Sequence, residues 1–123
     1  MGEFVYYNRN PEGDTIGDCV IRAISLASGL DYYEVEHKLY LLSGLLECDR
    51  FCICCYRFLL DDIFKYPTVD AEGYSLQQFA DLHPYGKYIV RMDGHLSTII
   101  DGICYDIFDC THEILTDAWY AGE

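Results

Sequence analysis

The sequence predicts a single α+β domain over residues 1–123, with N-terminal helices packed on a C-terminal antiparallel sheet. Three observations lead to this fold class. Apolar residues recur at helical spacing in the first part of the chain, whereas shorter, strand-like runs follow Gly86. Asp-Gly pairs separate those runs, as is typical of β-hairpins. The length of 123 residues suits one domain with a core of its own.

The first helix is expected after a loop over residues 8–18, which is rich in Asn, Asp and Gly. Residues 19–30 turn apolar at helical spacing. Gly29 ends this pattern, because glycine readily adopts the backbone conformation that closes a helix. The predicted helix therefore begins at or next to Cys19.

Three more helices are expected before the sheet. A capping-box-like pattern starts a helix at Asp31 that runs to about Ser43. The cysteine-rich stretch over residues 52–64 is predicted to be helical. A second capping signal at Ser75 starts a short helix, which stops before Pro84 because the residue preceding a proline disfavours helical geometry.

The C-terminal third predicts an antiparallel sheet. Strands are expected over residues 87–92, 95–100 and 103–109, joined by Asp-Gly turns. The tail over residues 113–120 fits either a fourth strand or a turn of helix. Because the helices precede the strands, the layout is α+β and not an alternating βαβ fold.

Composition and charge exclude several classes of protein. The chain has 21 acidic and 8 basic residues, a net charge of −13 and no two adjacent bases, so a surface that follows nucleic-acid phosphates is not expected. No apolar run approaches the ~18 residues of a membrane span, and the first residues, from Met1, carry no secretory signal. We therefore expect a cytoplasmic protein, with no nucleic-acid or membrane partner, whose seven cysteines stay reduced.

Cys19 has the sequence context of a nucleophile. The Gly17-Asp18 pair ends the loop, so Cys19 is expected in the first turn of a helix, where unpaired backbone N–H groups stabilise a thiolate. The same N–H groups bind the oxyanion that forms when a thiolate attacks a carbonyl. Asp18 opposes this role, because a carboxylate beside the thiol disfavours the thiolate unless it points away.

His95 follows Asp93-Gly94 at the start of a predicted strand, where it can serve as the base that a cysteine nucleophile needs. The base needs an orienting acceptor in turn, and Asp106 and Asp109 are the two candidates on the next strand. Hairpin register decides between them. A two-residue turn at Asp101-Gly102 places Asp106 on the face of His95, on a diagonal, whereas a three-residue loop with a bulge places Asp109 opposite His95.

These features resemble the papain-like cysteine peptidases. The resemblance lies in residues 17–23 (GDCVIRA), in Gly94-His95, in Asp101-Gly102 and in residues 105–109 (YDIFD). Small forms are the most similar: the Josephin deubiquitinases, the bacteriocin-leader-processing peptidases and, more specifically, a group of small phage and gut-bacterial proteins. The resemblance implies a papain-like fold and a cysteine peptidase or isopeptidase in the cytoplasm of a bacterium or a phage-infected host.

The resemblance also implies the roles of individual residues. Cys19 is assigned as nucleophile, His95 as general base and Asp109 as orienting residue, with Asp106 in reserve. Papain-like enzymes carry the orienting residue just before a turn after the second strand, which favours Asp109. The expected substrate is a peptide or protein, and no cofactor or metal is expected.

One departure from the family concerns the oxyanion. Papain-like peptidases usually carry a Gln shortly before the nucleophile, whereas this chain has Gly13 and Asp14 there. A carboxylate cannot donate to an oxyanion, so the amide of Asn10 or Asn8 in the same loop is the expected substitute. Loss of one such donor typically costs ~10²–10³ in rate. The alternative function is therefore a weak or inactive papain-like module, phage-encoded, that sequesters a host protein or small ligand.

The remaining cysteines and the tyrosines carry weaker signals. The pairs typical of zinc sites are not matched in the cluster of Cys48, Cys52, Cys54 and Cys55. We expect these thiols to pack in the core, with a zinc-stabilised interaction domain as a weaker alternative. The twelve tyrosines include the adjacent pairs Tyr6-Tyr7 and Tyr32-Tyr33, which favour a peptide or protein partner, or self-association into a homo-oligomer.

Overall fold

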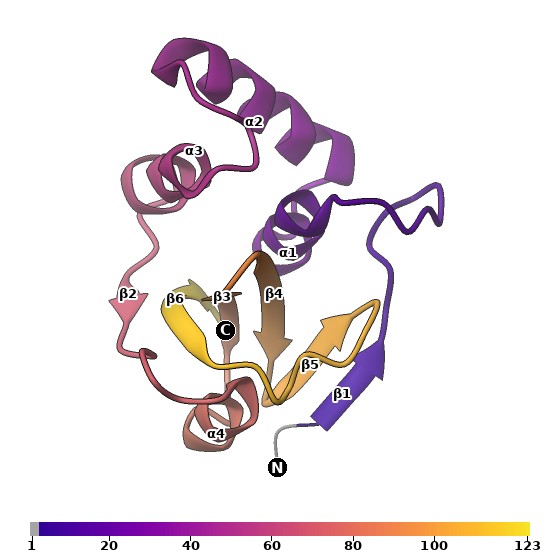
Figure 1. Cartoon of the computed structure of the whole chain (residues 1–123), viewed down its shortest axis with the longest axis vertical. Coiled ribbons are helices and arrows are strands. Elements are labelled where there is room, and N and C mark those ends of the chain that lie inside the picture. Colours follow the sequence, from indigo (N-terminus) through magenta and orange to yellow (C-terminus); the bar gives the residue numbers. More distant parts are fainter. Residues whose placement is uncertain (1–2) are drawn as a thin grey trace.

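The computed structural model describes residues 3–123 and shows a six-stranded sheet with helices packed against it (Figure 1). Met1 and Gly2, part of the stretch predicted to lack a secretory signal, lie outside the described residues. The strands follow the spatial order β1-β5-β4-β3-β6-β2. β1 pairs in parallel with β5, and the other neighbouring pairs are antiparallel. The strand bounds are β1 Glu3–Tyr6, β2 Thr68–Val69, β3 Lys87–Met92, β4 His95–Ile100, β5 Ile103–Asp106 and β6 Leu115–Gly122.

The helices lie close to the predicted ranges, and their caps are the expected ones. α1 ends at Gly29 in the left-handed conformation, at φ 79°. The Asp31 side chain caps α2, and Ser75 forms a capping box at the start of α4. Within residues 3–123, no helix is long and apolar enough to cross a bilayer. The helix bounds are α1 Cys19–Ser28, α2 Tyr32–Leu46, α3 Ile53–Phe58, the π-helical turn η1 Leu59–Ile63 and α4 Leu76–Leu82.

The mixed α+β class is confirmed, but the strands are not all C-terminal as predicted. β1 precedes every helix, and β2 lies between η1 and α4. Both are short strands at the two edges of the sheet, and so few residues do not show the alternation by which a strand is recognised in a sequence. The tail is strand β6, which lies between β3 and β2.

The sheet separates two hydrophobic clusters. Residues of α1, α2 and α3 pack with the sheet residues Ile89 and Leu96 on one face. Phe79 of α4 packs with Val90 and Ile99 on the other. Side chains alternate along a strand, so the adjacent residues Ile89 and Val90 enter opposite clusters. Burial of each such side chain stabilises the fold by about 1.5–3 kcal/mol.

The turn between β4 and β5 has two residues and fixes the register that the sequence left open. Ile100 pairs with Ile103, which leaves Asp101 and Gly102 as the turn. Both turn residues have positive φ, 50° and 80°, as a two-residue hairpin turn of the Asp-Gly type requires. β5 begins directly after this turn and ends at Asp106, three residues earlier than predicted.

Candidate active site

Cys19 is the first residue of α1, and its side chain is half-buried. Asp18 occupies the N-cap position but makes no side-chain cap hydrogen bond. The first-turn N–H groups of α1 are therefore not taken up by the residue that usually caps a helix. The start of the helix keeps the donors and the dipole that favour a thiolate at Cys19.

The Asp18 carboxylate is held in a buried network. Its Oδ1 accepts a hydrogen bond from Nε of Arg22 at 2.7 Å, and its Oδ2 accepts one from the Tyr32 hydroxyl at 2.6 Å. Burial by itself raises the pKa of Asp18, but the hydrogen bonds from Tyr32 and Arg22 outweigh it and lower the pKa. The Asp18 carboxylate is thus directed toward Arg22 and Tyr32 by hydrogen bonds.

His95 and Asp106 meet at one end of the β4–β5 hairpin, where β4 begins and β5 ends. Nε2 of His95 lies 2.7 Å from Oδ2 of Asp106. The ring of Phe108 packs against the imidazole with a centroid separation of 4.7 Å. These two contacts fix the orientation of the ring and leave Nδ1 as the nitrogen available to Cys19.

Cys19 and His95 shift each other's pKa in the directions expected of an ion pair. Burial raises the pKa of Cys19, but hydrogen bonds with His95 and with the backbone of Leu96 outweigh it and lower the pKa. Burial lowers the pKa of His95, but hydrogen bonds with Asp106, Cys110 and Cys19 raise that pKa to about 11. Both shifts favour a thiolate–imidazolium pair.

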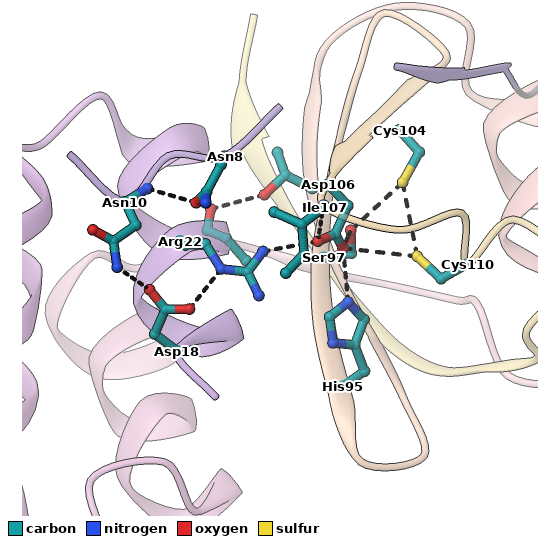
Figure 2. A network of polar contacts seen from close by, with 12 residues as sticks. Asn8, Asn10, Asp18, Arg22, His95, Ser97, Cys104, Asp106, Ile107 and Cys110 are labelled. Atoms are coloured by element: carbon teal, nitrogen blue, oxygen red, sulfur yellow. Dashed lines mark hydrogen bonds and ion pairs between the residues drawn. The ribbon is translucent and has the colours of Figure 1, made fainter. Parts of the chain in front are cut away.

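Asp106 connects His95 to Arg22 (Figure 2). Its Oδ1 accepts hydrogen bonds from Nη1 of Arg22 at 2.8 Å and from the backbone N–H of Ile107 at 2.7 Å. Its Oδ2 accepts one from the Ser97 hydroxyl at 2.6 Å. Burial raises the pKa of Asp106, but the hydrogen bonds from His95 and Ser97 bring it down to about 2. Asp106 is therefore an ionised carboxylate held in one orientation.

The structure places Asp106 against His95, whereas the sequence favoured Asp109 for this position. Asp109 is exposed in the turn after β5, where it accepts hydrogen bonds from the N–H and the hydroxyl of Thr111 at 2.9 and 2.6 Å. The physical reason is the two-residue turn, because a register changed by one residue would move Asp106 to the opposite face.

Asn10 is also placed differently from the expectation. It is buried, and its Nδ2 donates to Oδ2 of Asp18 at 3.0 Å and to the Tyr32 hydroxyl at 3.3 Å. Nδ2 of Asn8 donates to the backbone carbonyl of Asp14 at 2.8 Å. Both amides are thus engaged within the loop that precedes α1, and neither is the oxyanion donor that the sequence suggested. Asn10 positions Asp18 instead.

Two hollows open beside the thiol–imidazole pair, and Cys19 and His95 line both. The apolar hollow has a volume of about 330 Å³. Its further lining residues include Val20, Phe51, Ile53, Tyr56, Met92 and Leu96. The acidic hollow has a volume of about 600 Å³ and carries the carboxylates of Asp93, Asp109 and Glu113. The thiol and the imidazole therefore border two hollows, one mainly apolar and one mainly acidic.

Sequence reasoning missed Arg22, Ser97 and Cys110. Arg22 is buried in the apolar stretch of α1, within one helical turn of Cys19. A single charge inside an apolar helix pattern was the available signal, because a charge is buried only when it is paired. Ser97 and Cys110 gave no such signal, since only the fold brings them to Asp106.

The cysteine cluster around α3 does not gather ligands for one ion. Cys52 and Cys54 are exposed, with their sulfur atoms 3.1 Å apart, whereas Cys55 is buried and Cys48 is half-buried. The predicted core packing thus holds for Cys55 and in part for Cys48. Among residues 3–123, one group of three metal-ligating side chains has all its ligand atoms within 4.8 Å of one another: His95, Asp106 and Cys110.

Cys19, His95 and Asp106 lie in the order thiol, imidazole and carboxylate, beside an uncapped helix start. Comparisons with known proteins found no family model, no curated protein and no solved structure that matches the chain.

Proposed function

We propose that the chain is a small papain-like cysteine hydrolase that cleaves a peptide or isopeptide bond by acyl transfer. The observation that supports this most directly is the convergence of Cys19, His95 and Asp106. The thiol lies at a helix start, and Nε2 of the imidazole lies 2.7 Å from a carboxylate that is itself fixed by Arg22. Nucleophile, base and orienting acceptor are the three roles that triad-type catalysis needs.

In the proposed reaction, the Cys19 thiolate attacks the substrate carbonyl carbon, so a C–S bond forms and the carbonyl electron pair moves to oxygen. The Nδ1 proton of His95 passes to the leaving amine as the C–N bond breaks. Water then attacks the thioester, His95 takes up a proton from it, and the C–S bond breaks to release a carboxylic acid. Asp106 holds the Nε2–H of His95 through both steps.

The start of α1 supplies the oxyanion donor in this mechanism. The backbone N–H of Cys19 lies in the first turn, and Asp18 does not cap that turn. Such an N–H group binds the negative oxygen of a tetrahedral intermediate, and the helix dipole has the matching sign. The side-chain donor usual in the family has no counterpart at Asn8 or Asn10, whose amides are engaged elsewhere.

The papain-like assignment is part of the proposal. A helix that starts with the nucleophile and packs on the sheet next to a strand that starts with the histidine is consistent with it. A peptide or protein substrate and a cytoplasmic location in a bacterium or phage-infected host stay predictions.

Alkylation with iodoacetamide tests the proposed nucleophile. Near pH 6 an ordinary thiol, with a pKa of about 8.5, is almost fully protonated, whereas Cys19 should remain reactive. Peptide mapping should therefore find Cys19 labelled first among the seven cysteines. Cys19→Ala should keep the far-UV circular dichroism spectrum and lose the cleavage of a proteome-derived peptide mixture. Cys48→Ala, which changes another half-buried cysteine, is the matched control and should retain that cleavage. Equal labelling of all thiols, or an active Cys19→Ala protein, would reject the proposal.

A binding module without catalysis is the second candidate, and the engaged amides of Asn8 and Asn10 favour it. Loss of a side-chain oxyanion donor costs ~10²–10³ in rate, enough to leave a protein that binds without appreciable turnover. The pH dependence of Cys19 alkylation separates the two candidates. A thiol that titrates well below pH 7 supports the hydrolase, and one that titrates near ~8.5 supports the binding module.

A further inference from the structure

Cys110 is a buried thiol that the proposed hydrolysis does not use. It lies in the turn after β5 with 1% of its surface exposed, and its Sγ is 3.8 Å from Oδ2 of Asp106. Nε2 of His95 lies 2.7 Å from the same oxygen (Figure 2). An imidazole nitrogen, a thiol sulfur and a carboxylate oxygen are thus gathered at one point, and these are the three donor types that bind zinc(II) in proteins.

We propose that His95, Asp106 and Cys110 form a zinc(II) site, and that zinc bound there prevents His95 from acting as the base for Cys19. The three ligand atoms lie within 4.8 Å of one another. A tetrahedral ion with bonds of about 2.0–2.3 Å needs ligand atoms about 3.3–3.8 Å apart. An oxygen and a sulfur on such an ion lie about 3.5 Å apart, so the Asp106–Cys110 separation of 3.8 Å has to shorten by about 0.3 Å, and the His95–Asp106 separation of 2.7 Å has to widen by about 0.6 Å.

Zinc(II) at this site replaces two protons, which together carry the same charge as the metal ion. The Nε2–H bond of His95 and the S–H bond of Cys110 break, and both protons leave to solvent. Bonds form from zinc to the imidazole nitrogen, the thiolate and Oδ2 of Asp106. Two protons leave the ligands and one zinc(II) ion arrives, so the net charge of the ligand group is unchanged. Cys19 loses its imidazolium partner and takes up one proton from solvent, so one proton is released in net, and no oxidant or reductant is needed. Affinity should therefore rise with pH, because binding releases protons.

The acidic hollow gives zinc a path to these ligands. His95 and Cys110 both line it, together with three carboxylates and one cation, Arg22, which is itself paired with Asp18 and Asp106. The three carboxylates are those of Asp93, Asp109 and Glu113. A hollow with carboxylates on its wall raises the local concentration of a cation. A water molecule from the same hollow completes the fourth position, as in zinc sites with three protein ligands.

The groups around Asp106 hold the carboxylate in place for an ion. The Ser97 hydroxyl donates to Oδ2 at 2.6 Å, and Nη1 of Arg22 donates to Oδ1 at 2.8 Å. Such outer partners fix ligand orientation, and their loss typically weakens metal binding 10–100-fold. The site therefore has three ligands of suitable type, a fixed carboxylate and an open approach.

The effect on Cys19 rests on the proposed function, whereas zinc binding itself does not. With Nε2 on the metal, the imidazole is neutral and keeps its remaining proton on Nδ1. It then offers Cys19 no acceptor for the thiol proton and no positive charge to stabilise the thiolate. Zinc should consequently slow the alkylation of Cys19 at pH values where the metal-free protein reacts quickly.

The test uses the full chain with Cys52→Ser and Cys54→Ser, because the two exposed sulfur atoms 3.1 Å apart are competing ligands. Zinc affinity is measured by competition with a chromogenic chelator, and cobalt(II) is used to detect thiolate-to-metal charge transfer. Cys110→Ser should weaken zinc binding by about 100-fold or more and remove the charge-transfer band. Cys104→Ser is the matched control, since its sulfur is equally buried and 3.9 Å from that of Cys110, and it should keep both signals.

Zinc affinity and the cobalt(II) charge-transfer band test the metal site independently of the proposed hydrolysis, because neither measurement needs a substrate. His95→Gln changes a half-buried ligand and should also weaken zinc binding, which keeps the test decisive if Cys110→Ser does not fold. Zinc affinity should rise about 10-fold per pH unit where two protons are displaced and Cys19 takes one up, and up to about 100-fold per pH unit where Cys19 stays a thiolate. Equal zinc affinity in the parent, Cys110→Ser and His95→Gln proteins would overturn the site. Tight binding through these ligands with unchanged Cys19 alkylation would overturn the inhibitory role.

Discussion

Replacement of Arg22 by methionine tests the buried charge network that supports the site. Nε of Arg22 lies 2.7 Å from Asp18 and Nη1 lies 2.8 Å from Asp106, and the three side chains are exposed by only 7%, 2% and 3%. Methionine keeps much of the volume but leaves two buried carboxylates without their cation. Removal of one partner from a buried ion pair typically costs 3–5 kcal/mol.

The structure indicates a value near the lower end of that range. Asp18 keeps the hydrogen bonds from Tyr32 and Asn10, and Asp106 keeps those from His95 and Ser97. We therefore expect Arg22→Met to lower the free energy of unfolding by about 3 kcal/mol. Urea denaturation followed by Trp119 fluorescence measures this change, with the slope of the transition as a check on two-state unfolding.

A matched control separates burial from ion pairing as such. Arg57 and Asp117 form a pair at the same 2.8 Å, but their side chains are 46% and 27% exposed. Exposed pairs contribute under about 1 kcal/mol, so Arg57→Met should have a small effect. Equal destabilisation by Arg22→Met and Arg57→Met would mean that the buried network stabilises the fold no more than an exposed ion pair does, which would refute the expected difference.

Three further predictions concern the same residues. Since the folded-state pKa of Asp106 is lowered from 3.8 to about 2, its stabilising contribution of about 2 kcal/mol is present above about pH 4 and lost as the pH falls toward 2. Urea midpoints of the parent and Asp106→Asn should accordingly differ near neutral pH and converge in acid. Asp106→Asn should slow Cys19 alkylation near pH 6, while Asp109→Asn leaves the rate unchanged. A slower reaction in Asp109→Asn, with an unchanged rate in Asp106→Asn, would instead identify Asp109 as the residue that orients His95. Asn10→Ala should lower the free energy of unfolding by about 1–2 kcal/mol, because it removes hydrogen bonds to the buried Asp18, and an unchanged urea midpoint would contradict this.

The elements that the sequence predicted well are those with strong local signals. Cys19 follows a Gly-Asp pair and starts an apolar helical pattern, and the structure begins α1 at that residue. The turn at Asp101-Gly102 forms where the Asp-Gly pair predicted it, because few other residues tolerate its positive φ values. Cys19 and His95 share two hollows, as the proposed pairing requires.

The predictions that were wrong concern features that depend on contacts between distant segments of the chain. The choice between Asp106 and Asp109 depended on a register that local sequence does not fix. β1 pairs with β5 across most of the chain, so the strand-favouring residues Phe4, Val5 and Tyr6 do not by themselves show that they join the sheet. The engagement of Asn10 by Asp18 depends on where the loop before α1 folds back, and this is set by the tertiary contact with Tyr32.

The strand that comes last in the chain, β6, lies inside the sheet between β3 and β2. Arg22 and Asp106, which are 84 residues apart, also meet only in the finished fold. A nascent chain on the ribosome therefore carries Cys19 long before His95, Asp106 and β6 have been synthesised. Under the proposed function, Cys19 therefore lacks its base while most of the chain is being made, and hydrolysis can begin only after the C-terminal part has been synthesised.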